Sequence, residues 1–165
     1  MLRKGVGVLV AAGIAGGGYS YFGKDDVPDD AARSAQIGDC LNLTGTSFNA
    51  ASEAISCDDP GATYLVTATG GTCDKHEDEY TVTYTGVGAP SDVKVCLTVN
   101  AKKGDCFFVN PTMPGPMKKL PCKRSNVKVV AVKHKTANPK ACPKKKDVYG
   151  VGNKTRGQLV CFTRV

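Results

Sequence analysis

The sequence has little of what most catalytic and metal sites use. It contains only two histidines, His76 and His134, and neither lies in a recognised local motif with a serine or cysteine nucleophile. No Cys-x-x-Cys pair occurs, which disfavours zinc, iron–sulfur and thioredoxin-like redox sites. We therefore predict a protein that is not an enzyme, with both histidines exposed and with no catalytic residue, cofactor or metal.

Calcium-loop spacing is also missing, although acidic residues surround His76. These residues are Asp74, Glu77, Asp78 and Glu79. They do not follow the Asp-x-Asp-x-Asp-Gly pattern that places oxygen ligands around calcium. We interpret the segment as a hydrated acidic loop and not as a cation site.

Helical periodicity is absent beyond the first 23 residues, where no window of 11 residues has apolar side chains recurring every 3.6 positions. Instead, short β-branched and aromatic runs alternate with Gly, Pro and Asp turns. The runs expected to form strands are 63–69, 80–84, 93–99, 127–132 and 159–165, and residues 44–51 are expected to be a loop. The predicted class is mainly β.

Acidic side chains are scarce in the second half of the chain. Residues 38–100 carry two basic side chains and nine acidic ones, whereas residues 101–165 carry sixteen basic side chains and two acidic ones. A charge asymmetry of this kind indicates which partners the protein can attract, and it does not indicate the fold. It fits either a solvated basic face, partly neutralised by the acidic half, or attraction to an anionic polymer or surface. Specific nucleic-acid binding is disfavoured, because no helix-turn-helix, zinc finger or aromatic RNP motif accompanies the charge.

What the sequence does contain is a duplication. Gly38-Asp39-Cys40 returns as Gly104-Asp105-Cys106, and each copy continues with three further cysteines, apolar runs and a tyrosine in the same order. Matching features in register over some 60 residues indicate an internal repeat. In both copies the Asp carboxylate is expected to accept hydrogen bonds from nearby backbone N–H groups.

Eight cysteines suit two units too small to be stable on a hydrophobic core alone. We expect structural disulfides, and hence an oxidising compartment, in preference to metal ligation or catalytic thiols. If each copy closes its own bonds in the same way, three connectivities are left. We favour the one with Cys40–Cys57, Cys73–Cys96, Cys106–Cys122 and Cys142–Cys161.

The N-terminus reads as a membrane segment. Arg3 and Lys4 precede residues 6–22, which carry no charge. As a helix, these 17 residues would reach about 25 Å, close to the roughly 30 Å hydrocarbon core. The positive-inside rule places the N-terminus in the cytoplasm and the rest outside. No clean Ala-x-Ala site follows, so an uncleaved signal anchor is favoured over a cleaved signal peptide.

These observations predict four segments. Residues 1–23 are a transmembrane helix, residues 24–36 a flexible acidic stalk, residues 37–100 an acidic β module and residues 101–165 a basic β module. The predicted architecture is therefore two tandem small disulfide-stapled β modules behind a single N-terminal transmembrane helix.

The motifs also resemble a family. The basic head, apolar run and acidic stalk, followed by Gly38–Leu41, Ser56–Pro60, Ala62–Val66 and Val95–Leu97, are similar to the LppU-type envelope proteins of actinobacteria, and more distantly to the septum-formation-type domain. The resemblance is clearest over residues 37–97. It implies a bacterial, membrane-attached, extracytoplasmic protein and brings no catalytic residues. Lipid anchoring is not implied, because no lipobox cysteine is present.

We therefore predict a non-enzymatic, membrane-anchored module of the cell envelope with a binding or structural role. Its expected partners are the cell membrane, anionic wall polymer or lipid head groups, and an envelope or division protein. The alternative is a secreted effector or inhibitor-like protein released by signal cleavage. The anion-binding candidates flank two cysteines of the basic module: Lys118, Lys119, Lys123, Arg124, Lys140, Lys144, Lys145 and Lys146.

Overall fold

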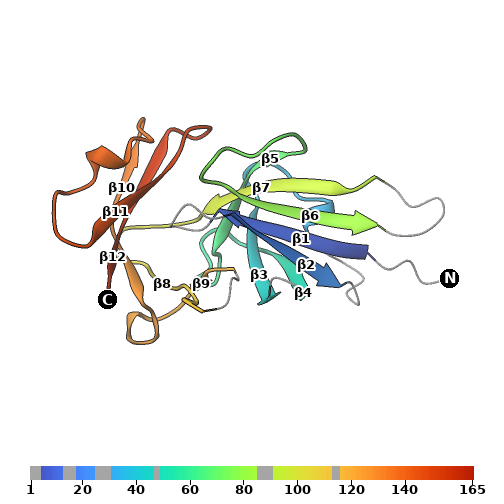
Figure 1. The fold of residues 1–165 in the computed structure, drawn as a ribbon, viewed down its shortest axis with the longest axis horizontal. Helices are drawn as coiled ribbons and strands as arrows, with labels where there is room; N and C mark the ends of the chain where they lie inside the picture. Colours follow the sequence, from blue (N-terminus) through green and yellow to red (C-terminus); the bar gives the residue numbers. More distant parts are fainter. Residues whose placement is uncertain (1–4, 13–17, 25–30, 47–48, 85–90, 113–115) are drawn as a thin grey trace.

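The chain folds into two antiparallel sheets, and the predicted class, mainly β, is confirmed (Figure 1). The computed structural model describes residues 5–12, 18–24, 31–46, 49–84, 91–112 and 116–165. The first sheet has the order β2-β1-β6-β7-β5-β3-β4. Its strands are β1 (Gly5–Ala12), β2 (Gly18–Lys24), β3 (Cys40–Thr46), β4 (Asn49–Ile55), β5 (Tyr64–Thr69), β6 (Asp78–Tyr84) and β7 (Val93–Val99).

The second sheet has the order β11-β12-β10-β8-β9. Its strands are β8 (Cys106–Phe108), β9 (Lys118–Lys119), β10 (Val127–His134), β11 (Val148–Asn153) and β12 (Gln158–Arg164). Five strands of the first sheet, β6-β7-β5-β3-β4, match these five strands one for one. Each strand has the same place across the sheet and the same place along its repeat as its counterpart in the second sheet. Both sheets also have a register shift at the equivalent place, between Val66 and Ala68 and between Val129 and Ala131. The two repeats therefore share one fold.

The Gly-Asp-Cys turn is built identically in the two repeats. Gly38 and Gly104 have φ angles of 100° and 97°, in the left-handed region that favours glycine. The N–H of each glycine donates to a carbonyl of the neighbouring strand at 2.9 Å. The carboxylates of Asp39 and Asp105 each accept a hydrogen bond, at 2.7 Å, from the backbone N–H three residues upstream. This confirms the backbone-fixing role predicted for the two aspartates.

All four predicted disulfides are present, with the predicted partners. They are Cys40–Cys57, Cys73–Cys96, Cys106–Cys122 and Cys142–Cys161. In the first repeat the first bond joins the two ends of the β3–β4 hairpin, and the second ties a loop to β7. The second repeat places its bonds equivalently, so each sheet is fastened at two points.

The repeats do not have separate cores. One cluster of buried side chains runs through both and includes Tyr64, Val66, Leu97, Phe107, Val129 and Phe162. The Phe107 and Phe162 rings pack edge to face at 6.3 Å. The hydroxyl of Tyr64, from the first repeat, accepts a hydrogen bond from the N–H of Met117, in the second, at 2.7 Å. Because the two units share buried contacts, we expect them to unfold together.

The N-terminal segment is not the continuous helix predicted for residues 1–23. Residues 5–12 and 18–24 form the hairpin β1–β2, and β1 extends the first sheet by pairing with β6 from Gly5↔Tyr84 to Val10↔Glu79. Residues 1–4 and 13–17 lie outside the described part of the chain. In the described residues, the structure has no helix with both the length and the apolar character needed to span a bilayer. Alternating glycine and valine explain the difference, because glycine lowers helix stability by about 1 kcal/mol and β-branched side chains favour strands.

The structure also differs in part from the flexible stalk predicted for residues 24–36. Ala31–Arg33 is a short 3-10 helix, η1, and Ala32 is buried in the core. The N–H of Ala32 donates to the Ser52 hydroxyl at 2.8 Å. A small apolar side chain can fit against the sheet where a longer one could not, so this end of the segment belongs to the folded unit. Residues 25–30 lie outside the described residues.

Candidate anion-binding surface of the second repeat

The most prominent charged feature is the segment 139–146, which we call the lysine loop. It runs from η3 (Pro139–Ala141) to the start of β11. Lys140, Lys144, Lys145 and Lys146 are all exposed. None of these four ammonium groups forms an ion pair with any residue in the described part of the chain. Their charge is therefore free to attract an external anion.

The sequence holds this loop close to the sheet. Cys142 is bonded to Cys161, which is fully buried in β12. The Asn138 side chain accepts from the N–H of Lys140 and so caps η3. On the strand beneath, a Cβ at Gly150 would lie only 2.7 Å from the Sγ of Cys142 and 3.1 Å from the Cα of Pro139. The lysine loop is therefore stapled at one point and packed directly on the backbone of β11.

A shallow hollow of about 500 Å³ lies within the lysine loop. Lys140, Lys144 and Lys145 line it together with the two prolines of the loop, Cys142 and Val148. Several ammonium groups around one open hollow suit a ligand with several oxygens, such as a phosphate group. An ammonium binds phosphate as a point charge, without the planar geometry that a guanidinium imposes.

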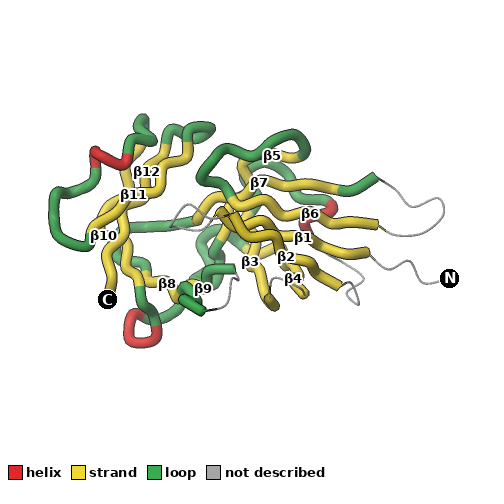
Figure 2. The backbone as a smooth tube through the Cα atoms, in the orientation of Figure 1, coloured by secondary structure: helices red, strands yellow, loops and turns green. Residues whose placement is uncertain are grey.

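The other candidates form a separate group. Lys118, Lys123 and Arg124 are exposed near the Cys106–Cys122 disulfide. β9 and β11 are opposite edges of the second sheet, and Figure 2 shows η2 (Cys122–Arg124) and η3 at opposite ends of it. The eight candidates are therefore not one surface, and the lysine loop is the denser group.

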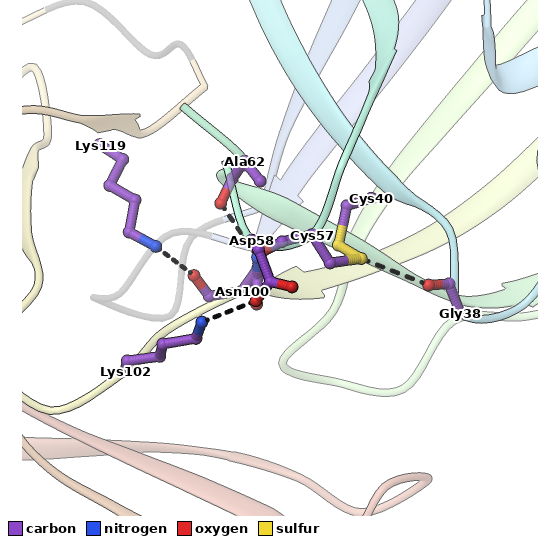
Figure 3. Close-up of a disulfide and its surroundings, with 8 residues drawn as sticks. All are labelled: Gly38, Cys40, Cys57, Asp58, Ala62, Asn100, Lys102 and Lys119. Carbon is purple, nitrogen blue, oxygen red and sulfur yellow. Dashed lines mark hydrogen bonds and ion pairs between the residues drawn. A yellow bond between two sulfur atoms is a disulfide. The ribbon is translucent and has the colours of Figure 1, made fainter. Parts of the chain in front are cut away.

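Lys119 does not belong to either exposed group. Its ammonium lies 2.7 Å from the Asp105 carboxylate, with the two side chains 12% and 23% exposed. It also donates to the carbonyl of Asn100 at 3.2 Å (Figure 3). The ammonium lies 5.8 Å from the centre of the Phe107 ring. Its charge is already compensated and largely covered, so the structure does not place Lys119 with the exposed candidates. It is a structural residue at the junction of the repeats.

Acidic residues of the first repeat meet the second repeat at a few points. Asp58 pairs with Lys102 at 3.1 Å, but the side chains are 92% and 65% exposed, so this ion pair adds little stability. Asp74 accepts a hydrogen bond from the N–H of Lys154 at 3.0 Å. The basic repeat is thus only partly neutralised by docking, and the lysine loop takes no part in these contacts.

Glu77 was expected in a hydrated loop, and its place in the structure corrects that interpretation. It is only 4% exposed. One carboxylate oxygen accepts from the side-chain amide of Asn153 in β11, and the other from the N–H of Asp74, both at 2.7 Å. Asn153 is itself 3% exposed. Glu77 is therefore a buried link between the repeats, which no local sequence pattern signalled.

The remaining candidate groups lack the features of a reactive or metal centre. His76 and His134 are exposed, as predicted, on different repeats. Within the described residues, Cys73, Cys96 and Glu77 bring three ligand-type atoms within 4.8 Å of one another. Cys73 and Cys96 are bonded to each other, however, so they offer no thiolate to a metal.

Comparisons with protein-family models, with curated proteins and with solved structures find no match for this chain.

Proposed function

We propose that the protein is a non-enzymatic binding module of the cell envelope whose lysine loop binds phosphate-bearing anions at the outer face of the membrane. The observation that carries this proposal is the set of four exposed lysines, with no acidic partner among the described residues, on a loop held by the Cys142–Cys161 disulfide. A structural role alone would not require such a concentration of like charge, because like charges repel one another. The shared chemistry of the ligands is phosphate, carried either by wall polymer or by lipid head groups.

The proposed location is extracytoplasmic. Four disulfides suit an oxidising compartment, and Arg3 and Lys4 precede the apolar segment in the order that leaves the C-terminal part outside. The resemblance to LppU-type envelope proteins points the same way. In a bilayer the segment 6–22 would have to be helical, because lipid offers no partner for strand backbone groups. Membrane insertion and pairing with β6 are then alternative placements of one segment.

The location is tested with reporters fused after Val165 in a bacterial host. We expect a reporter that needs export to be active and one that needs the cytoplasm to be inactive. The mass of the mature N-terminus then separates an uncleaved anchor from a secreted product. Activity of the cytoplasmic reporter alone would contradict an extracytoplasmic location.

The anion-binding role is tested on the full-length chain, since the shared core makes isolated repeats unsuitable. Replacing Lys144, Lys145 and Lys146 with alanine should weaken binding to vesicles containing anionic phospholipid by about a hundredfold at low salt. The reason is that each basic side chain near an anionic membrane contributes about 1 kcal/mol. Wild-type binding should also weaken steeply as salt rises, because the Debye length falls from about 10 Å at 0.1 M to about 3 Å at 1 M.

Two charge-matched variants serve as controls in the same vesicle assay. One removes Lys118, Lys123 and Arg124 from the opposite edge of the sheet, and the other removes the exposed Lys135, Lys154 and Arg156. Both should weaken binding only a few-fold, since they lower the net charge equally without altering the lysine loop. Equal losses in all three variants would show that only total charge matters, and would contradict a site at the lysine loop.

A further inference from the structure

A groove of about 790 Å³ opens on the second repeat next to the lysine loop. Its walls are mainly apolar and include Val109, Pro111, Val127 and Val148. Val148 lines both this groove and the hollow within the lysine loop. The cationic hollow and the groove are therefore neighbours on the second repeat, with Val148 between them.

Three polar residues, Asn126, Asp147 and Arg164, also line the groove. The side-chain amide of Asn126 donates to the carbonyl of Val109 at 2.6 Å and accepts from its N–H at 2.9 Å. The Asn126 side chain therefore uses its hydrogen bonds on the Val109 backbone and offers a ligand no strong hydrogen-bonding partner. Arg164, at the exposed end of β12, and the exposed Asp147 are the two charged residues that line the groove.

Tyr149 adds a partly buried aromatic ring to the groove. It stacks on Phe162 with ring centres 5.7 Å apart and an angle of 20° between the planes. Burial raises the pKa of the Tyr149 hydroxyl, an effect that the positive charge of Arg164 opposes. The hydroxyl is therefore uncharged at neutral pH, so Tyr149 adds no negative charge to that of Asp147, which Arg164 of the same groove offsets.

We propose that this groove binds the alkyl chain of an anionic amphiphile, whose phosphate head group lies on the lysine loop. The proposal rests on the function proposed above and deepens it, because it names a lipid-like source for the phosphate. A soluble polyanion would use the lysines alone and leave the apolar walls in contact with water. An amphiphile covers those walls and places its charge beside Lys144 and Lys145, which line the neighbouring hollow.

The experiment measures affinity of the full-length chain for a series of monoalkyl phosphates, below their aggregation concentrations, by calorimetry at low salt. Inorganic phosphate and inorganic polyphosphate serve as probes without an alkyl chain. We expect affinity to rise about two- to fourfold with each added methylene, which corresponds to partial or full burial of that group. Constant affinity from ethyl to octyl phosphate would overturn the groove proposal.

The isosteric variant Val109→Thr places a hydroxyl in the groove while keeping side-chain size, at a residue that does not line the hollow within the lysine loop. It should weaken octyl phosphate binding several-fold and leave polyphosphate binding unchanged. Val130→Thr on β10, outside the groove, is the matched control and should change neither. Loss of octyl phosphate and polyphosphate binding together in the Val109 variant would contradict a separate site for the alkyl chain.

The two proposals can fail independently in this design. If affinity is independent of chain length but falls in the Lys144, Lys145 and Lys146 variant, the groove proposal is wrong and the anion site stands. If that lysine variant binds every probe as the wild type does, the proposed function is wrong. Binding of polyphosphate alone would identify the polymer, and not the lipid, as the source of phosphate.

Discussion

Replacing Cys142 and Cys161 with alanine should lower the free energy of unfolding by about 3 kcal/mol. A disulfide that closes a loop of roughly 20 residues restricts the unfolded chain by about this amount in the chain-entropy model. Cys161 is fully buried in β12, so alanine is the replacement that adds no polar group to the core. The quantity is measured by urea unfolding of the oxidised protein.

The same variant should bind anionic vesicles less tightly, because the disulfide holds the lysine loop against the sheet. The control is the equivalent pair of replacements at Cys106 and Cys122, which should destabilise the protein similarly but leave anion binding largely intact. A loss of less than 1 kcal/mol on removing Cys142–Cys161, or equal binding losses in the two variants, would contradict this view of the loop.

Replacing Glu77 with alanine should lower the free energy of unfolding by about 2 to 3 kcal/mol. The buried amide of Asn153 would lose its carboxylate partner, and an unsatisfied buried donor is costly. Glu77→Gln, which keeps an acceptor oxygen for Asn153, should cost less. Chemical denaturation followed by near-ultraviolet circular dichroism would measure both changes.

Glu79 provides the control for Glu77. It lies two residues away and forms a more exposed ion pair with Lys94, so Glu79→Ala should cost no more than about 1 kcal/mol. Because the core runs through both repeats, the wild type should unfold in one transition. Two separate transitions, or equal effects at Glu77 and Glu79, would show that the contact between the repeats is not important for stability.

The duplicated features carried most of the information about the fold. Cysteines in register reduced the possible disulfide connectivities to three, and the one that we favoured is the one present. The β-branched runs and the missing helical periodicity predicted the class. Strand β4 was not predicted. It is formed by Asn49–Ile55, a stretch of small and polar residues with weak strand propensity that is held by pairing with β3.

The structure differs from the sequence-based predictions at the N-terminus and at Lys119 and Glu77, and the causes are related. Residues 6–22 are apolar enough for a membrane helix, but their glycines and β-branched or aromatic residues are equally compatible with β1, which pairs with β6, and with β2, which pairs with β1. For Lys119 and Glu77, type and spacing predict exposed charges. Only the tertiary structure brings Asp105 to the first and Asn153 to the second. Arg164, which lines the groove, had no recognisable sequence signal, and Tyr149 was noted only as the tyrosine that recurs in the second copy.

The central claim, that the lysine loop is where the protein meets phosphate-bearing anions, is tested most directly by NMR. Full-length protein labelled with ¹⁵N would be titrated with inorganic polyphosphate at low salt. We predict that the largest amide shift changes fall on Lys140 to Val148 and disappear at high salt. Changes centred on the first repeat, or spread evenly over all exposed lysines, would contradict the claim.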